Sequence, residues 1–219
     1  MMTRNYFDNE LQELKLDLIR MSSIVEDALS NSINALKRQD TDLAEKVIES
    51  DDIVDKMEIA IEDKCLKLIA LQQPIAKDLR IIATALKIIT DLERIADHAV
   101  DIAKITKRLS KEKYIKELID IPRMAYIVTG MVKDSIDAYV KQDIEKAKEV
   151  SKRDDEVDGL HAQIFRELLL LMMEDPKKIN QSTYFLFISQ YIERIADHVT
   201  NICEWTIYGV TGEHIDLNE

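Results

Sequence analysis

Six residues that carry two carboxylates, an arginine and a histidine occur twice in this chain of 219 residues. The stretch Glu93–His98 reads Glu-Arg-Ile-Ala-Asp-His, and it recurs letter for letter at Glu193–His198. An identical stretch at an offset of about 100 residues is typical of an internally repeated architecture. The sequence therefore predicts two similar halves, each with one helix that carries this acidic motif.

In each half a third polar residue, Asp101 or Asn201, follows the Glu and Asp of the motif at the same spacing of four residues. Residues at i and i+4 lie about 40° apart around a helix, so three such residues share one face over two turns. Apolar residues such as Leu92 and Ala96 flank that face and place it at the edge of the core. The candidate metal ligands on these helices are Glu93, Asp97, Asp101, Glu193, Asp197 and Asn201.

The helix before each motif also presents acids beside its apolar stripe. Val47, Val54 and Ile61 recur every seven residues, and Val150, Val157 and Ile164 do the same in the second half. Two helices that bring carboxylates together must raise the carboxylate pKa values or bind a cation between them. The further candidate metal ligands are Asp51, Asp55, Asp154 and Asp158, with Glu58 and His161 at corresponding positions beside them.

The donor types leave the identity of the metal open. Oxygen ligands suit hard or borderline cations, so Mg, Mn, Fe and Zn are all candidates. His98 lies about 140° around the helix from Glu93 and cannot easily share an ion with it, which argues against an oxygen-activating di-iron centre. His98 and His198 are instead expected to pack between helices or to orient ligands.

Plainer interpretations of the same residues stay open. Acids four residues apart on a helix commonly form a solvated face or pair with a neighbouring arginine, here Arg94 or Arg194. These arginines could also contact phosphate, but no glycine-rich loop or phosphate-binding helix start is evident, so orientation of the adjacent carboxylates is favoured. No nucleophile elbow, P-loop, dinucleotide fingerprint or zinc-protease motif occurs, so no catalytic residue is expected.

Apolar periodicity divides the chain into six long helices, and a repeated Gln-Asp break, Gln39-Asp40 and Gln142-Asp143, ends the first helix of each half. In the first half we expect helices that end near Arg38, run from about Thr41 to just before Pro74, and run from about Ile75 to Leu109. In the second half we expect a helix with Pro122 in its first turn, a continuous second helix that ends before Pro176, and a third from Asn180 to Tyr208. The prediction is an all-α protein made of two tandem three-helix bundles, residues 1–110 and 111–219.

Bulk composition excludes several classes of protein. Four glycines and three prolines are too few for an all-β fold, and a formal charge of −12 repels nucleic acid. Cys65 and Cys203 form no paired motif and are expected to be reduced core thiols, which suits the cytoplasm. Neither a signal peptide nor a membrane-spanning segment is expected, so any contact with membrane complexes is peripheral.

One apolar run exceeds what a single helix face needs. Residues 168–173 read Leu-Leu-Leu-Leu-Met-Met. We expect this run to be buried between the two bundles, and a dimer or partner surface is the alternative.

The duplicated Glu-Arg-Ile-Ala-Asp-His motif, followed by Asp101-Ile102 or Asn201-Ile202, resembles the PhoU family of regulators of bacterial phosphate uptake. The resemblance covers essentially the whole chain and implies two three-helix bundles, a homodimer and metal binding at the acidic motifs. It also implies a cytoplasmic, non-enzymatic adaptor that couples a phosphate ABC transporter ATPase to a sensor histidine kinase and damps uptake and starvation signalling. Asp101 departs from the family's usual asparagine, which puts equal metal preference of the two sites in doubt.

Two other functions remain alternatives. A metal-dependent phosphate-ester hydrolase would use paired metals to activate water, and it would need a substrate-sized cleft. A metal-free helical scaffold would use the acidic faces only for docking.

Overall fold

The computed structural model describes residues 2–72 and 74–217, with side chains for residues 7–71 and 74–217. Met1 and residues 218–219, the outer ends of the two predicted domains, lie outside the described residues, as does Gln73. Over the described residues the fold is helical and without strands, which confirms the all-α prediction. The helices are α1 (Met2–Arg38), α2 (Thr41–Gln72), α3 (Ala76–Leu109), α4 (Asp120–Lys141), α5 (Ile144–Ser151), α6 (Asp154–Glu174) and α7 (Ile179–Thr211), with a 3-10 turn η1 (Pro176–Lys178).

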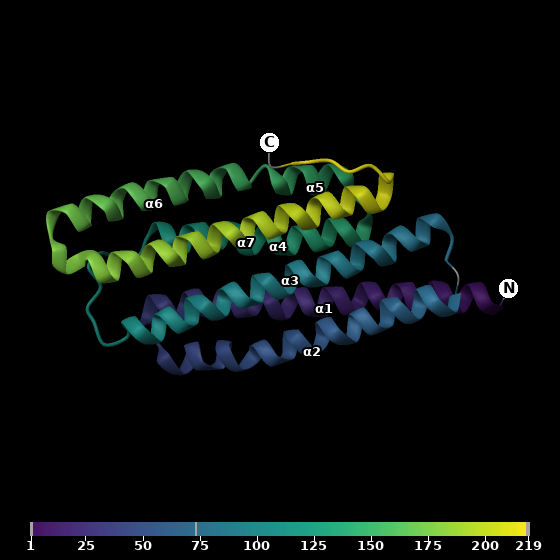
Figure 1. Cartoon of the computed structure of the whole chain (residues 1–219), viewed down its shortest axis with the longest axis horizontal. Coiled ribbons are helices and arrows are strands. Elements are labelled where there is room, and N and C mark those ends of the chain that lie inside the picture. Colours follow the sequence, from purple (N-terminus) through teal and green to yellow (C-terminus); the bar gives the residue numbers. More distant parts are fainter. Residues whose placement is uncertain (1, 73, 218–219) are drawn as a thin grey trace.

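Two sets of long helices lie side by side in an elongated molecule (Figure 1). Helices α1, α2 and α3 pack on one another in the first half, and α4, α5, α6 and α7 do so in the second. The halves meet where α3 runs antiparallel beside α7 and where α1 contacts α4 (Figure 1). A single apolar core continues across this junction, and the boundary between domains at residues 110 and 111 stays a prediction.

The repeated Gln-Asp breaks have the same structure in both halves. Gln39 and Gln142 end α1 and α4 in the left-handed region, with φ of 53° and 55°. Such a residue terminates a helix because its backbone N–H turns back to the last carbonyls. The side chains of Asp40 and Asp143 then accept hydrogen bonds from backbone N–H groups in the first turns of α2 and α5. Each break therefore reverses the chain and starts the next helix.

The second helix of the second half is interrupted, whereas the sequence predicts it to be continuous. Helix α5 ends at Ser151, and α6 begins at Asp154 after a tighter turn in which Arg153 N–H donates to the Val150 carbonyl. The Arg153 guanidinium lies 2.7 Å from Asp134 on α4, which fixes this turn against the neighbouring helix. The apolar stripe survives the interruption, since Val150, Val157 and Ile164 are all buried.

The apolar run of α6 is only partly buried, and the expectation that it fills the space between the bundles was wrong. Leu168 is buried, but Leu169, Leu170 and Met173 are 45%, 61% and 75% exposed. The reason is the place of α6 at the outer edge of the second half, packed on α4 and α7, while α3 covers the other side of α7 (Figure 1).

Among the described residues, no helix has both the length and the apolar character needed to cross a membrane.

Candidate functional site

The structure gathers the predicted carboxylates on two faces, one in each half. We call Asp51, Asp55 and Glu58 of α2 with Glu93 and Asp97 of α3 the first acidic face. We call Asp154 and Asp158 of α6 with Glu193 and Asp197 of α7 the second acidic face. In both faces, two antiparallel helices bring the acids close enough for the charge of one carboxylate to raise the pKa of another, as the spacing predicts.

In the first acidic face, partial burial and mutual repulsion oppose ionisation. Burial is the largest cause that raises the pKa of Asp51, and the charges of Asp55 and Asp97 raise it further. Burial likewise raises the pKa of Glu93, with Asp97 as the next cause. A positive charge offsets part of this repulsion, because Arg94 lies 3.6 Å from Glu93 and 3.5 Å from Asp97. The arginine of the first motif therefore orients its neighbouring carboxylates.

The second acidic face is more strongly perturbed. Burial, followed by the charges of Asp158 and Asp197, raises the pKa of Asp154 to about 7. One oxygen of Asp154 is 3.5 Å from the Thr200 hydroxyl, and the other is buried without a hydrogen-bond partner within the described residues. Burial also raises the pKa values of Glu193 and Asp197. This face therefore has the greater need of a proton or a cation.

Two of the predicted positions make contacts with residues other than the acids of these faces. Asp101 pairs with Lys104 at 3.4 Å, one turn beyond Asp97. Asn201 donates a hydrogen bond to Asp91 of α3 at 3.4 Å, so its amide faces the junction between the halves. The departure of Asp101 from the family asparagine thus adds a carboxylate whose charge Lys104 offsets.

His161 is held by the neighbouring helix. Its Nδ1 lies 3.1 Å from the Ser189 hydroxyl of α7, and burial lowers the pKa of its imidazole. His161 therefore stands beside the second acidic face with its ring held by Ser189.

The two motif histidines meet at the junction of α3 and α7. The His98 ring stacks on Tyr191 at 5.4 Å, and the His198 ring is 6.0 Å from that of His98. His198 Nδ1 contacts the nearly buried carboxylate of Asp91 at 2.9 Å. Burial lowers the pKa of His98 to about 4. Both histidines therefore pack between helices, and Asp91 is a polar contact that the motif spacing did not reveal.

The chain after α7 reaches the second acidic face. His214 stacks on Tyr208 at 4.2 Å, and the Leu217 backbone N–H donates to Glu204 at 2.8 Å. This course places Asp216 and Leu217 on the rim of a cavity of about 500 Å³ that Asp154, Asp158 and Asp197 also line. No sequence signal marked this segment, because its position depends on contacts with α7.

The acids do not form a ready metal cage. Over residues 2–72 and 74–217, no group of three or more His, Cys, Asp and Glu side chains is arranged to hold an ion. The donor chemistry still fits a cation, since clustered carboxylates with raised pKa values and the unsatisfied oxygen of Asp154 all gain from positive charge.

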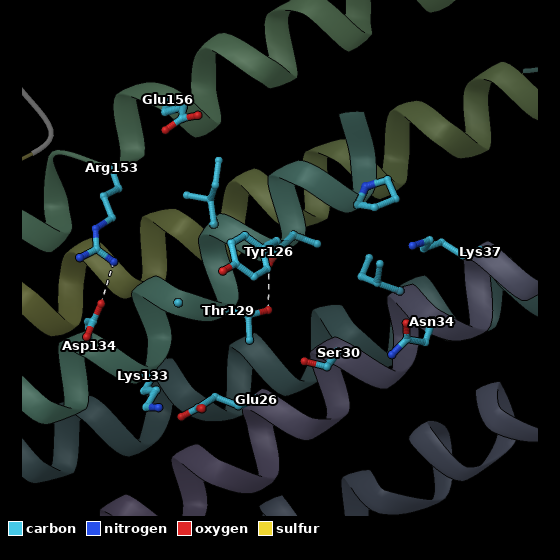
Figure 2. Close-up of a pocket in the computed structure, with 15 residues that line it drawn as sticks. Glu26, Ser30, Asn34, Lys37, Tyr126, Thr129, Lys133, Asp134, Arg153 and Glu156 are labelled. Atoms are coloured by element: carbon cyan, nitrogen blue, oxygen red, sulfur yellow. Dashed lines mark hydrogen bonds and ion pairs between the residues drawn. The ribbon is translucent and has the colours of Figure 1, made fainter. Parts of the chain in front are cut away.

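A second cavity, of about 760 Å³, lies between α1 and α4 beside the α5–α6 turn (Figure 2). Its lining mixes the bases Lys37, Lys133 and Arg153 with the acids Glu26, Asp134 and Glu156. The Arg153–Asp134 ion pair occupies one end of it (Figure 2). Balanced and partly paired charges give this cavity no strong preference for an anion or a cation.

A known domain family and several known proteins match this chain. The PhoU domain matches residues 18–106 and 121–206, one copy in each half. A phosphate-specific transport system accessory protein PhoU homolog from Clostridium acetobutylicum is 52% identical over 219 residues and 100% of both chains. The accessory protein PhoU of Escherichia coli K12 is 36% identical over 207 residues, 94% of this chain and 86% of that protein.

Solved structures agree with these sequence matches. The crystal structure of PhoU from Pseudomonas aeruginosa superposes with a TM-score of 0.91 at 34% identity, over 94% of this chain and 100% of that one. The phosphate transport system regulatory protein PhoU from Streptococcus pneumoniae gives 0.89 at 31% identity, over 96% and 99%.

Proposed function

Because the chain belongs to the PhoU family, and so to the accessory proteins of phosphate transport, we propose that it couples a phosphate ABC transporter to a sensor histidine kinase. In this role it restrains phosphate uptake and starvation signalling from the cytoplasmic side of the membrane, and it acts as a homodimer. The observation that carries the proposal is the full-length identity of 52% with a protein named as a transport accessory protein.

PhoU-family proteins are not enzymes, and the phosphate-ester hydrolase loses its support. The relatives and solved structures that match are accessory and regulatory proteins. A helical adaptor needs only surfaces that its partners recognise, and the two acidic faces are the most distinctive surfaces of this chain.

We assign a divalent or iron-type cation to each acidic face. Mg, Mn, Fe and Zn all suit carboxylate oxygens. Asp51, Asp55, Glu93 and Asp97 would hold the ion of the first face, and Asp154, Asp158, Glu193 and Asp197 that of the second. A bound cation would reduce the repulsion that raises these pKa values, and each face, bare or cation-loaded, would dock on basic or cation-bridged surfaces of the partner.

Co-purification of the transporter ATPase tests the docking role. We expect Glu93→Lys/Asp97→Lys to reduce ATPase recovery by about tenfold, the effect of losing one favourable charge cluster at an interface. The matched control is Glu13→Lys/Asp27→Lys, which makes the same change in net charge at two exposed positions of α1. Equal recovery with both double variants would contradict docking through the first acidic face.

The metal-free scaffold is separated from the cation-loaded adaptor by the same experiment after chelation. Protein stripped of metal that still recovers the ATPase in full would favour the scaffold. A loss of recovery that one metal restores would favour the cation-loaded form.

A further inference from the structure

The chain after α7 turns back and lies along α5 (Figure 1). We call residues 212–217 the strap. Gly212 makes the turn possible, because its φ of 80° lies in the left-handed region and its N–H donates to the Tyr208 carbonyl at 2.8 Å. The strap therefore starts from a fixed end of α7, and contacts with that helix set its course.

A few local contacts hold the strap in place. The His214 ring stacks on Tyr208 at 4.2 Å and meets the Trp205 ring edge-on at 5.9 Å. The Leu217 backbone N–H donates to Glu204 at 2.8 Å, and the Leu217 side chain packs against the core. Residues 212–216 are otherwise exposed. Because these contacts lie outside the core, the strap can open while the helices stay folded.

The strap adds negative charge to a site that is already acidic. The cavity of about 500 Å³ below it is lined by five acids and two lysines, and Asp216 of the strap is one of the acids. The others are Asp154, Asp155, Asp158 and Asp197, and the lysines are Lys148 and Lys152. Burial raises the pKa of Glu204, and the charge of Asp216 raises it further. The strap is therefore a poor electrostatic match for the surface that it covers.

The chain that follows α3, at the same stage of the first half, takes another course. The Gln39 side chain donates to the carbonyls of Leu109 and Glu112 at 3.0 and 2.7 Å. These contacts direct the chain across to the second half, where the Ile115 N–H donates to Gln181 at 2.6 Å. The folded-back strap is thus a feature of the second half.

We propose that the strap occupies a docking groove for a non-helical, lysine- or arginine-rich segment of a partner protein, and that such a segment displaces it. The strap itself shows that a non-helical chain fits along α5 and α7. Its residues Glu213 and Ile215 border a second cavity, of about 700 Å³, beside the α4–α5 turn. Opening of the strap would join the two cavities into one groove. Basic side chains would pair with the acids of this groove, which the acidic strap cannot do.

The inference rests on the docking role in the proposed function. It deepens that role by naming the chemistry of the partner segment and by adding a regulation of the second acidic face. A closed strap lowers the apparent affinity for the segment, because only molecules with an open strap can bind it. Docking at this face would then favour partners basic enough to displace the strap.

Two matched peptides test the groove on the full chain, in the presence of chelator. The basic peptide is Lys-Ser-Ile-Lys-Leu, and the acidic peptide is Glu-Ser-Ile-Asp-Leu, the order of the strap with serine in place of its histidine. Fluorescence anisotropy of dye-labelled peptide measures each dissociation constant. We expect the acidic peptide to bind at least about tenfold more weakly than the basic one. In the parent chain, emission of the single tryptophan, Trp205, should change as the basic peptide moves the His214 ring away.

Variants of the strap and of the groove should act in opposite directions. His214→Ala/Leu217→Gly loosens the strap and should raise the affinity for the basic peptide by about fivefold, because the ring stack no longer competes. Asp155→Asn/Asp158→Asn removes two acids of the groove and should lower that affinity by about tenfold. The matched control Glu13→Gln/Asp27→Asn makes the same change in net charge at exposed positions of α1 and should leave the affinity unchanged. Circular dichroism checks the helical content of every variant.

Three results would overturn the inference. An affinity that is equal in the parent and in His214→Ala/Leu217→Gly, with constant Trp205 emission in the parent, would contradict displacement of the strap. An affinity that Asp155→Asn/Asp158→Asn leaves unchanged would show that the peptide binds elsewhere, for example at the first acidic face. Equal binding of the two peptides would contradict the basic chemistry of the partner segment. None of these measurements involves the transporter, so the ATPase co-purification tests the adaptor role separately.

Discussion

The two acidic faces have the same motif in sequence and different electrostatics in structure. Arg94 bridges Glu93 and Asp97 in the first face, whereas over the described residues Arg194 forms no ion pair with the acids of the second. Asp154 follows the α5–α6 interruption and lies in a cavity that the chain after α7 helps to close, whereas Asp51 lies within the continuous α2. Identical letters therefore do not imply equal sites, because the elements around them set the charge balance.

The largest expected consequence is a difference in stability between matched variants. The pKa of Asp154, about 7, lies above the value of about 3.9 for an unfolded chain. The folded state thus holds a proton that the unfolded state has released, and the stability from this group, complete below about pH 4, is lost as pH rises through 7.

In chelator at pH 8, Asp154→Asn should therefore stabilise the fold by about 1–2 kcal/mol, a value discounted for the partial exposure of the site. Asp51→Asn, the matched change in the first face, should have a smaller effect. Urea unfolding at pH 8 and at pH 5 measures both. Equal changes in the free energy of unfolding for the two variants would contradict an electrostatic difference between the faces.

Cation affinity should show the next largest difference, through its pH dependence. A cation at the second acidic face must displace the proton of Asp154, so its affinity should fall by up to about tenfold per pH unit below pH 7. Calorimetric titration of the Glu93→Ala/Asp97→Ala variant, which keeps only the second face, measures this slope. An affinity that does not change between pH 8 and pH 6 would contradict the protonation of Asp154.

The arginines should give the smallest difference. Replacement of Arg94 by Gln removes contacts with two carboxylates and should destabilise the fold by about 0.2–1 kcal/mol, the range for exposed ion pairs. Arg194→Gln, the same change in the second motif, should have less effect. Thermal unfolding at low ionic strength measures the loss of stability in each variant, and high salt should reduce the difference between the two losses. A larger loss for Arg194→Gln would reverse the comparison.

Local patterns predicted most of the fold. The seven-residue stripes gave helices α2 and α6, and the Gln-Asp breaks marked the ends of α1 and α4, because both signals act over a few residues. The interruption between α5 and α6 was not predicted, since it depends on the contact of Arg153 with Asp134 on another helix. The exposed Leu169, Leu170 and Met173 were missed for a related reason, because hydrophobicity alone does not say which helix lies at the edge.

The sequence predicted which residues gather in the candidate site better than it predicted the contacts that they make. Helical spacing brought Asp51, Asp55, Glu93 and Asp97 together, and it did the same for their counterparts in the second half. It did not reveal the contact of the Asn201 amide with Asp91 across the junction of α3 and α7, and the role of Asn201 as a metal ligand stays a prediction. Such a contact depends on how the two halves pack against each other. The spacing of residues along one helix does not predict that packing.

Elemental analysis of protein purified without chelator or affinity-tag metal tests most directly whether the acidic faces bind cations. The parent is compared with Glu93→Ala/Asp97→Ala and Glu193→Ala/Asp197→Ala, each checked for helical content by circular dichroism. We predict stoichiometric metal in the parent and loss of one face's share in each double variant. No metal in the parent, with unchanged helicity in both variants, would contradict the cation sites and leave the faces as docking surfaces alone.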